Sequence, residues 1–196
     1  MMRVEVTGAR PSDPITTVLR LIVRAHDDLA SFWSNPRGWA PDEAAAIFDR
    51  CRLDRLAQLA RCLRYWIEEG APEEAEGRLV LARANLGALV EGAMQLGLTV
   101  FHADYSRSTR APRSKGVVTE APDLMLNTLR IFYRDEFWRL AESARWDKWA
   151  ESVQQRRNGV HAFAERNLGS HTDFLSDVRT YLEFLAAINN RLPYPD

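Results

Sequence analysis

The stretch LGALVEGAMQLGLTV, residues 86–100, decides the fold class. Its apolar residues recur at steps of three and four, the spacing of one face of an α-helix; they are Leu86, Leu89, Val90, Ala93, Leu96 and Val100. Gly87, Gly92 and Gly97 interrupt this stripe, and each costs about 1 kcal/mol relative to alanine in a helix. Close packing against a neighbouring helix explains such glycines better than a ligand-lining role. The stretch therefore predicts a buried, tightly packed helix.

The same periodicity extends over most of the chain. Helices are predicted from Pro14 to Asn35, from Pro41 to Gly70, from about Pro72, after Pro122, from about Asp147 and from Ser170 to Pro193. We therefore predict an all-α fold, an up-and-down bundle of five or six helices without a substantial sheet. Residues 1–196 are expected to form one domain, with 1–12 as an N-terminal arm.

Composition narrows the class of protein. Hydrophobic residues make up 46% of the 196 residues and charged residues 27%, which is typical of a globular protein. The formal net charge of -1 excludes a protein that coats nucleic acid by bulk attraction and leaves only a local basic site. We find no leader peptide and no apolar run of about 18 residues. Cys51 and Cys62 are about 16 Å apart along a helix, too far for a disulfide, so we expect a cytoplasmic protein with reduced thiols and no membrane contact.

The segment QRRNGVHAF, residues 155–163, carries the candidate chemistry. Arginine clamps phosphate oxygens with its planar donors, and histidine exchanges protons near neutral pH. On a helix continued through this segment, Arg157 falls on an apolar stripe and His161 follows one turn later on the same side. The other members of that stripe are Trp146, Trp149, Val153, Val160 and Ala164.

Arg156 followed by His161 resembles the Arg-x4-6-His motif of HEPN domains, small helical modules found in many ribonucleases of microbial defence and toxin systems. The resemblance covers residues 121–196, and further upstream it concerns only the general helical character. It implies a homodimer in which two copies of the motif converge into one RNA-cleaving cleft. In the family a polar residue often follows the arginine. Here Arg157 follows and Asn158 comes one place later, so Arg157 is the alternative motif arginine.

The resemblance also implies a mechanism. An RNA 2′-hydroxyl attacks the adjacent phosphate without a metal or other cofactor, and 2′,3′-cyclic phosphate ends result. His161 is expected to serve as acid or base, Arg156 or Arg157 to stabilise the phosphorane, and Asn158 to orient a phosphate oxygen or the imidazole. A toxin of this kind implies an antitoxin partner. Some toxins of the family carry a tyrosine where this chain has Phe163, so an antitoxin that modifies that tyrosine could not act here.

Residues 105–119 lose the helical periodicity and contain Arg107, Arg110, Arg113 and Lys115 with no acidic residue. The segment is expected to be an exposed, mobile, basic loop. A solvated connector is the favoured interpretation, and an arm that tracks RNA phosphates beside the ribonuclease site is the functional alternative.

The remaining candidates have structural interpretations. His26 lies among apolar positions and is predicted to be a hydrogen-bonded core residue. His102 and His171 each precede an aspartate by two residues, but neither has the partners that a metal site needs. Ser170 with Asp173 is typical of a helix capping box. The alternative function is therefore a non-catalytic helical dimer that binds a protein or a nucleotide.

Overall fold

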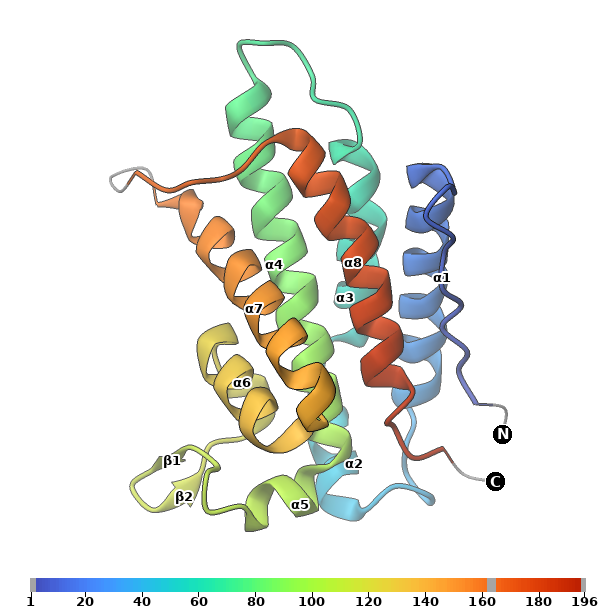
Figure 1. Ribbon diagram of the computed structural model, residues 1–196. Helices are drawn as coiled ribbons and strands as arrows, with labels where there is room; N and C mark the ends of the chain where they lie inside the picture. Colours follow the sequence, from blue (N-terminus) through green and yellow to red (C-terminus); the bar gives the residue numbers. More distant parts are fainter. Residues whose placement is uncertain (1–2, 162–164, 195–196) are drawn as a thin grey trace.

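The computed structural model describes residues 3–161 and 165–194 and is mostly helical (Figure 1). The α-helices in these ranges are α1 (Ile15–Trp33), α2 (Asp42–Phe48), α3 (Leu53–Cys62), α4 (Ala75–Val100), α5 (His102–Arg107), α6 (Leu126–Phe132), α7 (Leu140–Arg157) and α8 (His171–Asn189). The 3₁₀ turns are η1 (Leu63–Trp66), η2 (Ala121–Asp123) and η4 (Asn158–Val160), and η3 (Tyr133–Phe137) is a π-helical turn. Strands β1 (Arg113–Ser114) and β2 (Val117–Val118) form a small antiparallel hairpin.

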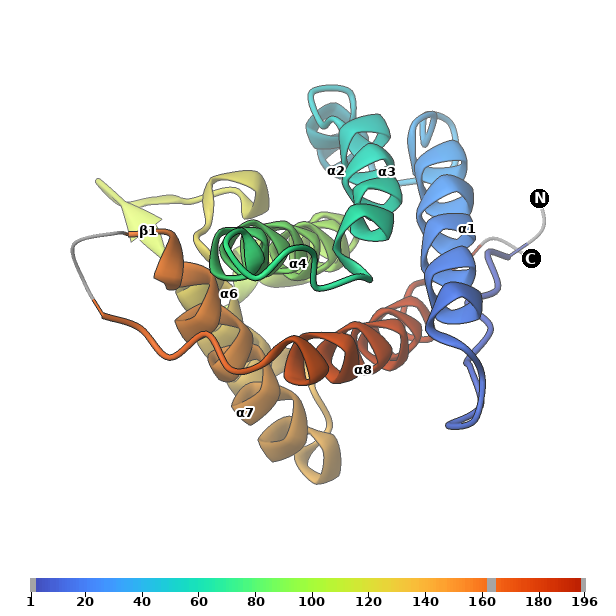
Figure 2. The same ribbon diagram turned by 90° about the horizontal axis from the view of Figure 1, so that it is seen from above.

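Helix α4 occupies the centre of the bundle. It contacts α3, α7 and α8, and α1 covers the outside of α3 and α8 (Figure 2). The chain runs down α1, up α3, down α4, up α7 and down α8 in the view of Figure 1. The predicted all-α, up-and-down architecture is therefore confirmed. In the described part of the chain, the sheet consists of two strands of two residues each.

The glycines of α4 make room for side chains from three different elements. A Cβ at Gly92 would lie 2.5 Å from Cδ1 of Leu56 on α3, and one at Gly87 would lie 2.6 Å from Cδ of Arg157 on α7. A Cβ at Gly97 would collide with the hydroxyl of Tyr133 on η3. The predicted close packing is confirmed, although side chains rather than helix backbones approach the glycines.

The predicted number of helices was too low. The second predicted helix is divided into α2, α3 and η1, and Arg52 has φ -108° and ψ 62° at the break. No glycine or proline marks this position, so the sequence pattern contained no signal for it. The helix predicted from about Asp147 begins earlier, at Leu140, after the π-helical turn η3 has ended α6.

The N-terminal arm is packed onto the bundle. Residues 3–10 form no helix or strand, but Val4 is buried and its carbonyl accepts a hydrogen bond of 2.9 Å from Nδ2 of Asn189. His26 is buried and lies 2.7 Å, Nε2 to Oη, from Tyr181, which confirms its predicted core role. Across the two described ranges, no helix combines the length and the apolar character needed to cross a membrane.

Candidate functional site

The motif segment leaves helix α7 earlier than the sequence pattern predicted. The helix ends at Arg157, Asn158 caps it, and the 3₁₀ turn η4 follows. His161 lies beyond this turn in extended backbone, with its side chain exposed and its N–H donating to the carbonyl of Asn158 at 3.2 Å. Gly159 lowers the helix propensity at this point, and a Cβ there would collide with Leu168.

The early end of α7 corrects the predicted apolar stripe at two residues. His161 does not continue the face of Arg157 on a helix, and Val160 is half-exposed rather than part of a buried stripe. Ala164 and Phe163, which completed the predicted stripe and the comparison with the toxin tyrosine, lie outside the described residues.

Arg156 belongs to a cluster that joins α4, α7 and α8. Its Nη1 donates to Oδ2 of Asp177 at 2.6 Å, and Nη1 of Arg83 donates to the same oxygen at 2.5 Å. Nε1 of Trp149 donates to the other carboxylate oxygen at 3.1 Å. Two guanidinium groups therefore share one carboxylate, and the indole fixes the orientation of that carboxylate.

The cluster is mostly withdrawn from solvent. Arg83 is 1% exposed and Asp177 8% exposed, whereas the side chain of Arg156 keeps 24% of its surface accessible. Burial lowers the pKa of Arg83, and its hydrogen bond to Asp177 acts in the opposite direction. Arg83 and Asp177 thus lie inside the bundle, whereas Arg156 reaches the outer edge of the bundle.

The start of α8 completes the surroundings of Arg156. Ser170 and Asp173 form the predicted capping box, which is confirmed. The backbone N–H and hydroxyl of Ser170, and then the charges of Arg156 and Arg83, lower the pKa of Asp173. Gly169 has a φ of +67°, and a Cβ there would lie 3.2 Å from Cζ of Arg156. A side chain at position 169 would therefore strain the backbone and crowd the guanidinium.

Arg157 faces a different helix and a single carboxylate. Its Nη1 donates to Oε2 of Glu91 at 2.7 Å, and the backbone N–H of Leu126, at the start of α6, donates to the same oxygen at 2.9 Å. The stem of Arg157 lies along Gly87. Its side chain is 33% exposed, so it was only partly correct to expect Arg157 on a buried stripe.

The basic segment 105–119 is largely exposed, as expected, but it contains regular structure where an irregular loop was expected. Its first residues belong to α5, and the β1–β2 hairpin follows. Arg107 pairs with Asp104, and Arg110 pairs with Glu136 at 3.2 Å and Asp135 at 3.4 Å. Arg113 donates to the carbonyl of Ser106. Acidic residues outside the segment therefore pair with Arg107 and Arg110, whereas Arg113 donates to backbone carbonyls.

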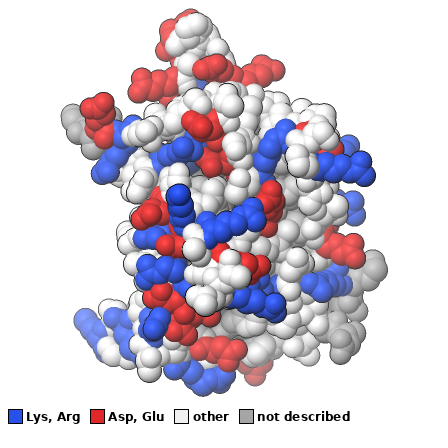
Figure 3. Space-filling view, in the orientation of Figure 1, with Lys and Arg blue, Asp and Glu red and all other residues white. Residues whose placement is uncertain are grey.

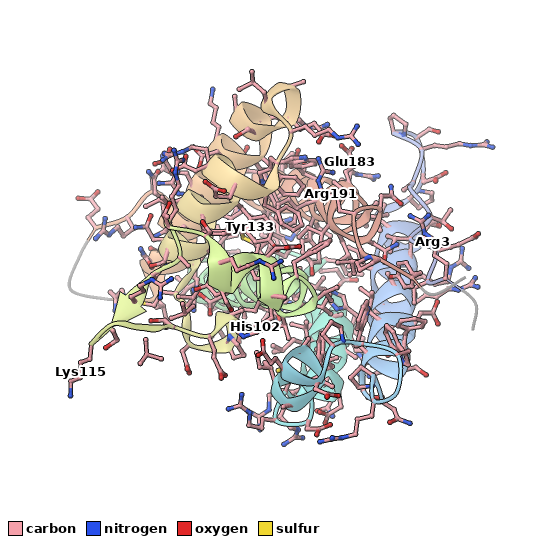
Figure 4. All side chains as sticks on the ribbon, turned by 90° about the horizontal axis from the view of Figure 1, so that it is seen from below. Arg3, His102, Lys115, Tyr133, Glu183 and Arg191 are labelled. Carbon is pink, nitrogen blue, oxygen red and sulfur yellow. The ribbon has the colours of Figure 1, made fainter. Side chains whose placement is uncertain are left out.

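Lys115 projects from the tip of the hairpin (Figure 4). The hairpin lies at one end of the bundle and the C-terminal end of α7 at the other (Figure 1). The segment therefore does not lie beside the motif within one chain, because α7 runs the length of the bundle between them. Figure 3 shows blue and red side chains intermixed over the visible face, rather than one continuous basic surface.

Other candidate groups have structural roles. His102 contacts the hydroxyl of Ser106 at 3.2 Å, and Nε2 of His171 lies 2.9 Å from the carbonyl of Trp66. Within residues 3–161 and 165–194, no group of three or more His, Cys, Asp or Glu side chains could hold a metal ion. Cys51 and Cys62 are free thiols, as predicted.

Sequence reasoning missed the acidic partners of the motif. Asp177 on α8 lies three residues after Phe174 and four before Tyr181, both of which are buried. A carboxylate at such a position requires a buried cation. Arg83 occupies an equivalent position three residues before Leu86 on α4, so these two residues together were the available signal.

Comparison of the chain with protein-family models, with curated proteins and with solved structures finds no match.

Proposed function

We propose that two copies of this chain form a metal-independent endoribonuclease of the HEPN type. The observation that carries the proposal is the arrangement at the end of α7. Arg156 reaches the edge of the bundle from a fixed cluster, and Asn158 and an exposed His161 follow it within five residues. Exposure of His161 leaves its imidazole available to RNA and to a second copy.

In this proposal Arg156 rather than Arg157 binds the scissile phosphate. Among the described residues only Nη1 of Arg156 is engaged, on Asp177, so most of the five N–H donors of the guanidinium remain for a phosphate. Moreover, Asp177 keeps Arg83 as a partner if Arg156 turns away. Arg157 differs, because no other cation in the described part of the chain pairs with Glu91 if Arg157 turns away.

His161 then transfers a proton to or from the RNA 2′-hydroxyl or the leaving oxygen, and Asn158 orients a phosphate oxygen or the imidazole. Arg156 stabilises the negative charge that develops on the phosphorane. The second copy supplies the same residues from the other side, since a two-fold axis repeats one surface. RNA is the substrate because DNA lacks the 2′-hydroxyl that attacks.

A second function, a non-catalytic dimer that binds a protein or nucleotide, is favoured by one observation. Both motif arginines are held by carboxylates of the same chain. In that case the arginines stabilise the bundle, and His161 has no chemical role.

The deciding experiment is an RNA cleavage assay with a chelator present. Replacement His161→Ala should lower the rate by about 100-fold or more, as expected for a positioned acid or base, and Arg156→Ala should do nearly the same. The products should carry 2′,3′-cyclic phosphate ends. His102→Ala, at the opposite end of the bundle, is the matched control and should retain the parent rate.

The same assay separates the two functions. Full activity in His161→Ala, or activity lost on addition of chelator alone, would remove the ribonuclease proposal and leave the binding dimer. Sedimentation of the parent at micromolar concentration should show a dimer. A monomer would contradict a site composed of two copies.

A further inference from the structure

A pocket of about 370 Å³ opens at the end of the bundle that carries α5, far from the C-terminal end of α7. Its floor is hydrophobic and largely aromatic, formed by Leu98, Phe101, Tyr105, Phe132 and Phe137. Its rim carries the charged side chains of Asp104, Glu136, Arg139 and Arg191. Figure 4 looks onto this end of the molecule, with Arg191 and Tyr133 labelled. The volume lies in the usual range for small-molecule sites.

The π-helical turn η3 forms one wall of the pocket. The N–H of Trp138 donates to the carbonyl of Tyr133 at 2.9 Å, five residues earlier. Such turns are rare, and they occur frequently at functional sites. Phe137 on the floor and Glu136 at the rim both belong to this turn. The Phe137 ring lies 6.0 Å from that of Phe101 at an interplanar angle of 72°, so two aromatic rings bound the floor.

The acidic groups at the rim are already neutralised. Asp104 pairs with Arg107 at 2.5 Å, and Glu136 pairs with Arg110 at 3.2 Å. These arginines belong to α5 and to the segment that follows it. A cationic ligand would have to displace them, so the acidic side chains do not recruit a cation.

The two arginines at the rim differ from one another. Arg191 is held in place because it pairs with Glu142 and its guanidinium lies 4.9 Å from the ring centroid of Trp138. Arg139 is exposed, and in the described part of the chain its side chain takes part in no ion pair or hydrogen bond. The unengaged charge at the mouth of the pocket is therefore positive.

We propose that this pocket binds a small planar aromatic carboxylate. The ring lies on the floor against Phe101 and Phe137, where aromatic faces and edges pack favourably. The carboxylate lies at the mouth, where the planar fork of Arg139 matches its two oxygens. The site is separate from the proposed ribonuclease centre, and its occupation does not depend on that activity.

The test is a titration followed by tryptophan fluorescence, because Trp138 lies 5.2 Å from the Phe137 ring at the pocket wall. 2-Naphthoate is the probe, and one saturable site per chain is expected. 2-Naphthamide keeps the ring without the charge, and cyclohexanecarboxylate keeps the charge without the flat ring. Both should bind at least about tenfold more weakly, given the usual strength of a charged hydrogen bond and of aromatic packing.

Two variants and a control locate the site. Arg139→Gln should weaken 2-naphthoate to the level of 2-naphthamide. Arg134→Gln should not, because Arg134 is an exposed arginine on η3 that pairs with Asp135 outside the pocket. Ser108→Trp fills the pocket from its lining and should abolish binding, with melting behaviour like that of the parent as the check on folding. Equal affinity for acid and amide, or unchanged binding in Arg139→Gln or Ser108→Trp, would overturn the proposal.

Discussion

Arg156 and Arg157 are consecutive residues, yet α7 directs them to different helices and into different electrostatic surroundings. Arg156 joins a buried cluster in which two arginines share Asp177. Arg157 makes a one-to-one pair with Glu91 on α4, in which both side chains are partly exposed. Because an unpaired charge costs most where water is excluded, we expect the cost of removing a partner to depend on the burial of the charges left behind more than on the length of the ion pair.

The largest effect is expected from Asp177→Ala. The change leaves Arg83 buried without a carboxylate and removes the partner of Arg156 and Trp149. Breaking a buried ion pair typically costs about 3–5 kcal/mol, and we expect a loss of that size in the free energy of unfolding measured with urea. Asp177→Asn keeps the shape and should cost less. A loss below that for Arg157→Ala would show that the cluster is not the stronger of the two.

The next effect concerns a buried group without a charged partner. Burial lowers the pKa of His26 to about 4 from its ordinary value of 6.5. As pH falls below 6.5 the unfolded chain takes up a proton that the folded chain refuses until about pH 4, so stability is complete above 6.5 and declines across this window. The gap corresponds to about 3 kcal/mol.

His26→Gln is the control for this pH dependence, because an amide can still donate to Tyr181 but does not titrate. Urea unfolding at several pH values between 4 and 7 should show a flatter profile for the variant. If both proteins lose stability equally across this window, the neutral buried imidazole is not the cause.

Arg157→Ala should cost about 1 kcal/mol, because the pair with Glu91 is partly solvated and such pairs contribute little. Arg157→Met preserves the stem that packs on Gly87 and should recover part of the loss. Thermal melting of the two variants and the parent separates the contribution of side-chain packing to stability from that of the ion pair. A cost above that of Asp177→Ala would reverse the comparison between the two arginines.

The sequence could predict the helices but not their charged contacts. The stripe from Leu86 to Val100 on α4 required a buried helix, and Ser170 with Asp173 predicted the start of α8. Both signals are local, since they depend on residues three or four apart. The partners of Arg156 and Arg157 come from α8 and α4, 21 and 66 residues away, and no local pattern encodes such distances.

At the end of α7, the local pattern predicted a longer helix than the structure has. The apolar spacing of Trp146, Trp149 and Val153 suggested that the helix continued to His161, but helix periodicity does not include the cost of Gly159 or its contact with Leu168. The candidate catalytic histidine was thus placed on a helix when it lies after one. Its exposure, which the ribonuclease proposal requires, could not be read from spacing.

The smallest loss of stability is expected from breaking an ion pair whose two side chains are exposed. Arg61 on α3 lies 2.5 Å from Asp27 on α1, closer than Arg157 lies to Glu91, but both side chains are well exposed. Water and salt screen such a pair, and ordering two long side chains offsets its attraction. Arg61→Ala should therefore change the free energy of unfolding by no more than about 0.5 kcal/mol. The difference from the parent should shrink further in about 0.5 M sodium chloride. The Arg61–Asp27 and Arg83–Asp177 pairs have the same separation of 2.5 Å but differ in exposure. A loss comparable to that of Asp177→Ala would therefore mean that distance rather than burial governs the strength of these ion pairs.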